Sequence, residues 1–181
     1  MHASSGQDRR ANLVGALAVA LTDRINESLR RGSDRGLSDT AALVHLYTRP
    51  GQTVEFLARV LRISHPAAVR VVDRLEAAEL VKRRPGRDDR SLALFLTARG
   101  RRAARTILDT RLAVMRDALS PLTSEEQEQL ETLLEKLLAG LIDGRWTARH
   151  VCRLCDFPVC EDPSCPVDRA VLAIERASTA P

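Results

Sequence analysis

Residues 53–96 limit the fold of this chain more than any other part of its sequence. Apolar side chains recur at helical spacing in two short runs, 53–61 and 64–79, with only a tight turn between them. Two strand-like runs follow, 80–84 and 91–96, and a turn rich in Pro, Gly and Asp joins them. Two helices in tandem followed by a hairpin predict a winged helix-turn-helix arrangement.

Helical spacing also dominates the rest of the chain. The helices predicted outside the winged segment are 8–31, 39–47, 97–119, 123–143 and 167–177. Ser38 can cap the second of these helices, and Thr123 with Glu126 forms a capping box for the fourth, which Gly144 ends. The predicted fold class is therefore mainly α with a small β-hairpin wing.

The N-terminal region holds the longest uncharged apolar run, Leu13–Leu21. Its nine residues are far fewer than the roughly 20 needed to cross a bilayer, so we expect no membrane partner. Arg9 and Arg10 before this run resemble the start of a secretory signal, but apolar residues repeat every fourth position as far as Leu29, as in an amphipathic helix. We therefore expect a cytoplasmic protein, with a signal peptide as the alternative.

Positive charge is concentrated in one part of the chain. The whole sequence has 28 Lys and Arg against 24 Asp and Glu, a net charge of +4. Residues 53–105 alone hold 13 basic and 6 acidic side chains, or +7, so the remainder carries −3. This concentration favours a nucleic-acid-binding face. In a winged helix-turn-helix the second helix enters the major groove, and the hairpin can place an Arg in the minor groove.

Several short motifs lie in and around this basic segment. They are Leu57-Ala58 with Leu61 before Ile63-Ser64, Val72-Asp73-Arg74-Leu75-Glu76, Leu80-Val81, and Asp88-x-Arg90-x5-Leu96-Thr97-x-x-Gly100. On these motifs, of which the last is quite specific, residues 8–143 resemble the MarR family of bacterial transcriptional regulators. The resemblance implies a homodimer held by the first, fifth and sixth helices. It also implies a repressor that releases its double-stranded DNA operator when a small-molecule effector, an oxidant or another signal arrives.

On this resemblance the chain divides into four parts. They are an N-terminal dimerisation helix (1–36), a winged helix-turn-helix DNA-binding domain (37–100), C-terminal dimerisation helices (101–144) and a cysteine-rich metal-binding tail with a short helix (145–181). The winged domain is thus joined to a helical dimerisation region. An effector pocket is expected on the surfaces of the first and second helices.

The resemblance assigns the DNA contacts of the second short helix by position. Ser64 and Arg70 match recognition-helix positions that the family uses for DNA, and His65 and Arg74 are further candidates on the same helix. Each has a structural alternative: Arg70 and Arg74 could pair with acidic side chains about one helical turn away, and His65 could be an inactive surface residue.

The hairpin supplies the second group of candidate residues. Arg87 and Arg90 are the predicted DNA contacts at the wing tip, and Asp88 and Arg90 match the wing motif of the family. Arg90 could instead pair with Asp88 and fix the shape of the loop.

All four cysteines lie within 14 residues near the C-terminus: Cys152, Cys155, Cys160 and Cys165. Prolines keep this segment out of continuous helix, so its sulfurs can gather around a centre. Four thiolates suit tetrahedral Zn²⁺, and the same ligands suit a [4Fe-4S] cluster. Redox-active thiols or disulfides are a third reading. His150 beside the cluster is interpreted as a bystander.

The cluster could act as a sensor that changes operator affinity, or it could only fold the tail onto the dimer. The sequence shows no nucleophile-base pair and no phosphate-binding glycine loop, so we expect no enzyme. Two alternatives remain: a thiol-disulfide oxidoreductase that uses Cys152-x-x-Cys155, and a metal-stabilised protein-interaction module.

Overall fold

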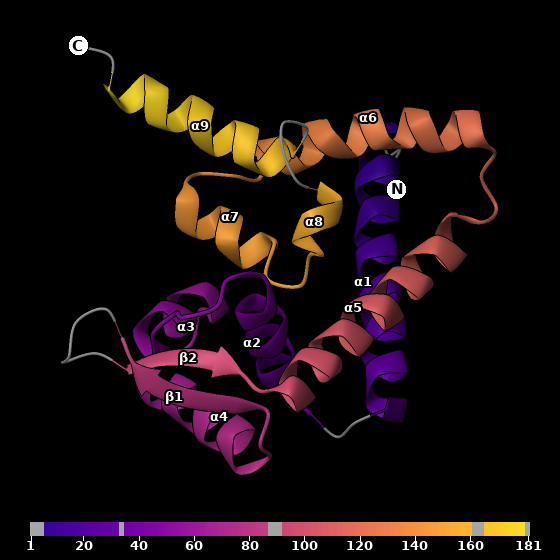
Figure 1. The fold of residues 1–181 in the computed structure, drawn as a ribbon. Coiled ribbons are helices and arrows are strands. Elements are labelled where there is room, and N and C mark those ends of the chain that lie inside the picture. The colour runs from indigo at the N-terminus through magenta and orange to yellow at the C-terminus, as the bar shows by residue number, and fades with distance from the viewer. Residues whose placement is uncertain (1–5, 33–34, 87–91, 161–164, 180–181) are drawn as a thin grey trace.

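A computed structural model describes residues 6–32, 35–86, 92–160 and 165–179, and these are mainly helical with one antiparallel hairpin, as predicted (Figure 1). The elements are α1 (Gly6–Gly32), α2 (Leu37–Thr48), α3 (Val54–Leu61), α4 (His65–Ala77), β1 (Val81–Pro85), β2 (Leu92–Leu96), α5 (Ala98–Leu119), α6 (Ser124–Gly140), α7 (Arg145–Val151), α8 (Phe157–Cys160) and α9 (Pro166–Thr179). None of the described helices is long and apolar enough to cross a membrane.

The main hydrophobic core joins α2, α3, α4, the hairpin and the first part of α5. Its largest fully buried side chains include Leu43, Leu46, Leu57, Leu75 and Leu94. Because α2 is buried along most of its length, α3 and α4 pack around it as one body with the hairpin. This core is the rigid base from which α4 and the hairpin project.

The hairpin pairs β1 with β2 in antiparallel register, from Val81 opposite Leu96 to Pro85 opposite Leu92. The segment before α3 adds one antiparallel bridge to the hairpin, because the backbone of Gln52 pairs with that of Leu94 in β2. The segment just before α3 and the middle of β2 are therefore tied by backbone hydrogen bonds.

Thr97 and Gly100 connect the hairpin to α5. The Thr97 hydroxyl accepts a hydrogen bond from the Gly100 amide at 3.0 Å and donates one to the Glu79 carbonyl at 2.7 Å. A Cβ atom on Gly100 would lie 1.9 Å from the Leu80 carbonyl oxygen. The Thr97-x-x-Gly100 spacing thus has a physical reason: it caps α5 and lets the helix approach the β1 backbone closely.

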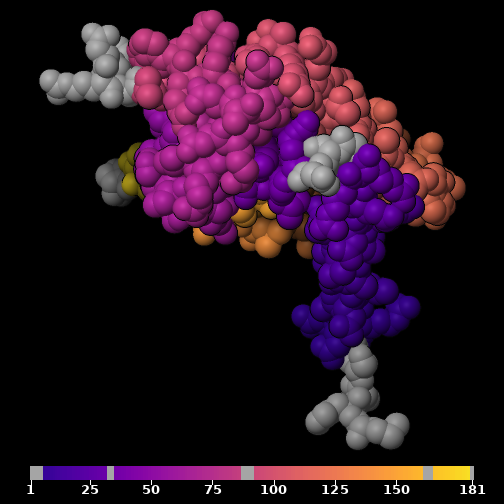
Figure 2. Space-filling view, turned by 90° about the horizontal axis from the view of Figure 1, so that it is seen from below, coloured from indigo at the N-terminus to yellow at the C-terminus, as the bar shows by residue number. Residues whose placement is uncertain are grey.

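α1, α6 and the second half of α5 contribute no buried residue to this core. α1 runs beside α5 and is held there by an ion pair of 2.7 Å between Arg24 and Asp117. Every residue from 6 to 20 is exposed, and Figure 2 shows the indigo α1 projecting from the rest of the molecule. α6 has no buried residue, and Leu133, Leu134 and Leu137 on the helix and Leu141 at its C-cap are exposed. These apolar faces have no partner within the described part of the single chain.

The C-terminal tail forms a second, smaller core around Ile142, Ala148, Val167 and Val171. α7 packs on α3 and on α9, and α9 also packs on α6, so the tail bridges the helix-turn-helix and the end of α6 (Figure 1). No helix is predicted between residues 143 and 167, but α7 and the one-turn α8 are helical there.

Two predicted helix ends are wrong. Ser38 does not cap α2, because the helix begins at Leu37 and Gly36 occupies the N-cap without a side-chain hydrogen bond. Gly144 does not end α6, which stops at Gly140; Gly144 is instead the N-cap of α7. Burial of Ile142 in the tail core turns the chain between these two helices.

Candidate nucleic-acid interface and cysteine cluster

The turn between α3 and α4 has well-defined geometry. Arg62 ends α3 in the left-handed conformation, with φ of 54°, and the Ile63 amide donates to the Ala58 carbonyl at 3.1 Å. The Ser64 hydroxyl then accepts a hydrogen bond from the Ala67 amide at 3.4 Å and caps α4, as the sequence predicts. These contacts fix the angle at which α4 leaves α3.

One face of α4 is buried and the opposite face is exposed. Ala68, Val71, Val72 and Leu75 pack into the main core. The four residues predicted to contact DNA from this helix, Ser64, His65, Arg70 and Arg74, are all exposed on the other side. An exposed, partly basic face at the N-terminal end of α4 is what entry into a major groove requires.

The predicted DNA-contacting residues of α4 differ in their local partners. Arg70 makes no ion pair with the acidic residues that the structure describes. His65 lies 3.2 Å from a carboxylate oxygen of Glu55. Arg74 donates to both carboxylate oxygens of Asp39 on α2, at 2.6 and 3.2 Å, and this hydrogen bonding raises the pKa of its guanidinium. Arg74 therefore links α4 to α2. Helical spacing could not predict Asp39 as its partner.

The base of the hairpin continues the basic surface. Arg83 is tied to α4 through Glu76 and Asp73, and the Arg84 guanidinium lies over the Phe95 ring, 5.8 Å from its centroid. The wing-tip residues Arg87, Asp88 and Arg90 lie outside the described residues, so their DNA contacts and the Asp88–Arg90 pairing stay predictions.

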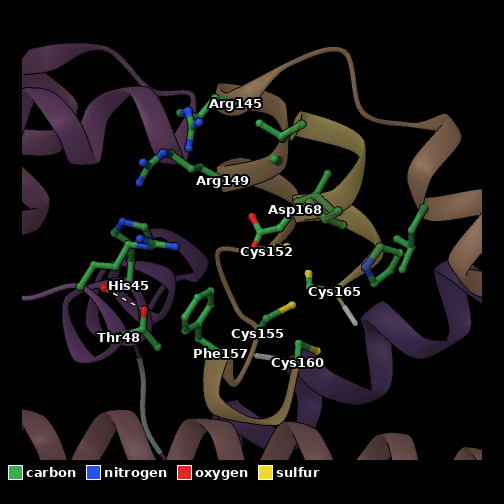
Figure 3. A pocket seen from close by; sticks show the side chains of 17 residues that line it. His45, Thr48, Arg145, Arg149, Cys152, Cys155, Phe157, Cys160, Cys165 and Asp168 are labelled. Carbon is green, nitrogen blue, oxygen red and sulfur yellow. Dashed lines mark hydrogen bonds between the residues drawn. The ribbon is translucent and has the colours of Figure 1, made fainter. Parts of the chain in front are cut away.

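The four cysteines lie close together on the wall of one cavity between α2 and the tail helices (Figure 3). All four are free thiols. Hydrogen bonding with Cys152 lowers the pKa of Cys155 to about 6 despite its burial, and Arg111 and Arg153 contribute to the same shift. The same hydrogen bond, together with burial, raises the pKa of Cys152.

Metal binding needs a closer arrangement of donors than this. Across the described ranges, no group of three or more His, Cys, Asp and Glu side chains is placed so that it could hold a metal ion. Cys160 is exposed, whereas the other three thiols are partly buried. The metal site predicted from the cysteine spacing thus stays a prediction.

The tail holds α3 through polar and aromatic contacts. The His150 ring lies with Nδ1 2.8 Å from the Val60 carbonyl oxygen, and Arg62 donates to the Thr147 hydroxyl at 3.2 Å. Trp146 packs on Phe56 with ring centroids 5.3 Å apart. His150 is therefore a structural contact between α7 and the helix-turn-helix, and its role beside the cysteines stays a prediction.

Comparisons with known proteins agree on one family. The sequence model of the MarR family matches residues 33–91. The uncharacterised HTH-type transcriptional regulator YkoM of Bacillus subtilis is 30% identical over 132 residues, which cover 71% of this chain and 86% of YkoM.

Solved structures give the same result for the fold. The YusO protein of B. subtilis has a TM-score of 0.64 at 25% identity, covering 76% of this chain and 97% of that one. Wild-type MarR of E. coli in its apo form has a TM-score of 0.60 at 25% identity, covering 71% and 96% of the two chains. Each of these matches leaves about a quarter of this chain unmatched.

Proposed function

This chain belongs to the MarR family of transcriptional regulators, which are DNA-binding proteins and not enzymes, and from its geometry we propose that it is a repressor that binds a specific operator as a homodimer. The observation that carries the proposal is the exposed face of α4, where Ser64, His65 and Arg70 stand at one end of a helix anchored on the opposite side in the main core. Arg70 is the residue with the greatest freedom to reach a base edge.

Dimerisation is supported by the apolar surface that one chain leaves exposed. Leu13, Val14 and Leu17 on α1 are all more than half exposed. The same holds for Leu133 and Leu137 on α6 and for Leu141 at its C-cap. Contiguous exposed apolar faces of this kind favour burial against a partner. A second copy would bury both faces and place two α4 helices for successive major grooves about one helical turn apart.

A gel-shift experiment tests the operator proposal. The probe is duplex DNA from the promoter region beside the protein's own coding sequence, with random duplex as competitor. We expect a shifted band that survives a large excess of random competitor. Equal competition by random DNA would contradict specific binding, and the interaction-module alternative predicts that result.

We propose further that Cys152, Cys155, Cys160 and Cys165 bind a metal centre, with Zn²⁺ favoured and a [4Fe-4S] cluster as the alternative. The donor types fit, because four free thiols share one cavity wall. The sulfurs would have to approach one another to complete the site. Bound metal would supply folding energy to the short segment that carries them.

The contacts of α7 suggest how such a centre could affect operator affinity. Cys152 directly follows α7, and α7 contacts α3 through His150, Thr147 and Trp146. A change in the cysteine cluster would therefore act on the helix that supports α4. The competing proposal is that the metal only stabilises the tail.

Metal analysis and DNA binding on the same sample separate these proposals. Colourless protein with about one zinc per chain supports zinc, and brown protein prepared without oxygen supports an iron-sulfur cluster. Loss of metal with a change in operator affinity supports sensing. Loss of metal with lower thermal stability and unchanged operator affinity supports a purely structural role, and protein that retains no metal contradicts both.

A further inference from the structure

The cavity beside the cysteines has a second, basic wall. Its volume is about 150 Å³, and it lies between the end of α2 and helices α7, α8 and α9. Figure 3 shows the sulfurs of Cys155, Cys160 and Cys165 on one side, and His45 and Arg149 on the other. The expected effector pocket involved α1 and α2, whereas this cavity combines α2 with the tail.

His45 has an unmet hydrogen-bonding group at this cavity. Only 5% of the residue is exposed, and its Nε2 has no hydrogen-bond partner among the described residues. The ring is held by stacking on Phe56, with centroids 5.5 Å apart. A buried polar atom without a partner is uncommon in folded proteins and calls for a ligand or a water molecule.

Two arginines on the same wall lack carboxylate partners. Within the described ranges, neither Arg49 nor Arg149 forms an ion pair, and each guanidinium instead lies over an aromatic ring: Arg49 over Phe157 and Arg149 over Phe56, both 4.9 Å from the centroid. The two like charges repel each other. Burial and then the neighbouring Arg49 and Arg145 lower the pKa of Arg149, and Asp168 acts in the opposite direction. An anion between them would relieve that repulsion.

The charged residues of the lining suit an anionic ligand. Arg145 already has a carboxylate partner, because its Nε and Nη2 donate to the two carboxylate oxygens of Glu175 at 3.0 and 2.7 Å. Asp168 is the acidic residue among those that line the cavity. Among the arginines and carboxylates of the lining, two arginines without an ion pair thus face one carboxylate, and this excess of arginine suits an anionic ligand.

Apart from Thr48 and the cysteines, the remaining lining is mainly aliphatic. Leu138, Val151, Val167 and Val171 contribute to it, and the one aromatic ring, Phe157, is already covered by Arg49. A cavity of this volume holds a molecule of about six carbon atoms. The free surface is therefore better suited to an alkyl chain than to an aromatic ring that needs a stacking face.

We propose that this cavity binds a short-chain aliphatic monocarboxylate, with its carboxylate at Arg49, Arg149 and the His45 ring and its alkyl chain against the valines of the tail. Such a ligand would join α2 to α7 and α9. Any effect of the ligand on operator affinity rests on the proposed DNA-binding function, but the binding itself does not.

Trp146, the only tryptophan of the chain, gives a direct readout because its ring lies beside Arg149, 5.8 Å from the guanidinium. Hexanoate is titrated into reduced, DNA-free protein, followed by tryptophan fluorescence and by calorimetry. We expect saturable binding of hexanoate and none of the neutral analogue hexanamide.

Variants locate the site. Arg49→Met and Arg149→Met should each weaken hexanoate binding about tenfold or more, since each removes a charge-assisted contact. Arg176→Met is the matched control, because Arg176 is exposed on α9 and is absent from the cavity lining, and it should leave the affinity unchanged. Circular dichroism checks that each variant keeps the wild-type helix content.

Several results would overturn the assignment. Equal binding of hexanamide would refute recognition of charge, tighter binding of benzoate would refute the aliphatic preference, and full competition by sulfate would refute the role of the alkyl chain. Unchanged affinity in both folded arginine variants would place the ligand elsewhere. Because DNA is absent, these outcomes do not depend on the outcome of the operator experiment.

Discussion

Replacing Gly100 with Ala should destabilise the winged domain through one atomic overlap. The added Cβ would lie 1.9 Å from the Leu80 carbonyl oxygen and 2.9 Å from the Leu80 carbonyl carbon. Both atoms belong to backbone, so no side-chain rotation can relieve the contact. Either α5 or the start of β1 must move by about 1 Å, a shift comparable to the overpacking that strains well-packed cores.

The size of the effect follows from what this shift disturbs. Overpacking of a core costs about 1–3 kcal/mol, and weakening the Thr97 cap adds roughly 1 kcal/mol. Alanine regains up to about 1 kcal/mol over glycine inside a helix. The expected net loss is about 2 kcal/mol, which for a chain of this size lowers the melting temperature by roughly 4–8 °C.

Thermal unfolding followed by circular dichroism measures this loss, at one protein concentration because a dimer's stability depends on concentration. Gly15→Ala is the control, because nothing lies within 4 Å of a Cβ at that position, and it should melt at or above the wild-type temperature. A Gly100→Ala protein that melts within 1 °C of wild type would refute the close approach of α5 to β1.

Two further predictions concern His45 and the dimer. Burial, and to a lesser extent Arg49 and Arg149, lowers the pKa of His45 to about 4. In the unfolded chain this histidine binds a proton near pH 6.5. The free energy of unfolding should therefore be highest above that pH and fall by up to about 3 kcal/mol towards pH 4. Urea titrations of wild type and His45→Gln should show that excess pH dependence only in wild type, and parallel curves would contradict it. Leu137→Glu should convert the dimer to monomer in sedimentation experiments, because Leu137 is 55% exposed on the apolar face of α6. Leu172→Glu on α9 is the control. A Leu137→Glu protein that dimerises with unchanged affinity would exclude this face of α6 from the dimer interface.

The elements with strong local signals could be predicted from the sequence. The helix-turn-helix and the hairpin follow from apolar spacing, and the capping box of Thr123 and Glu126 forms as expected. Ser64 likewise caps α4. In each case the residues that determine the structure lie within four positions of one another, so the local sequence is enough to predict their interaction.

Contacts between distant segments could not be predicted in this way. Asp39, the partner of Arg74, lies 35 residues before it, and Val60, the partner of His150, lies 90 residues before it. α7 escaped prediction because its seven residues are too few to show helical periodicity. The basic cavity wall combines α2 with the tail, so only the folded chain brings Arg49 and Arg149 together.

Operator binding by wild type and Arg70→Ala at several salt concentrations tests the central claim most directly, with fluorescence anisotropy of a labelled promoter duplex as the readout. Arg70→Ala should weaken specific binding by about 1–3 kcal/mol if it reads a base, or reduce the slope against log salt by about 0.9 if it contacts a phosphate. Arg176→Ala should match wild type. A wild-type protein that binds promoter and random duplex equally, or an Arg70→Ala protein with unchanged affinity and salt slope, would contradict the account.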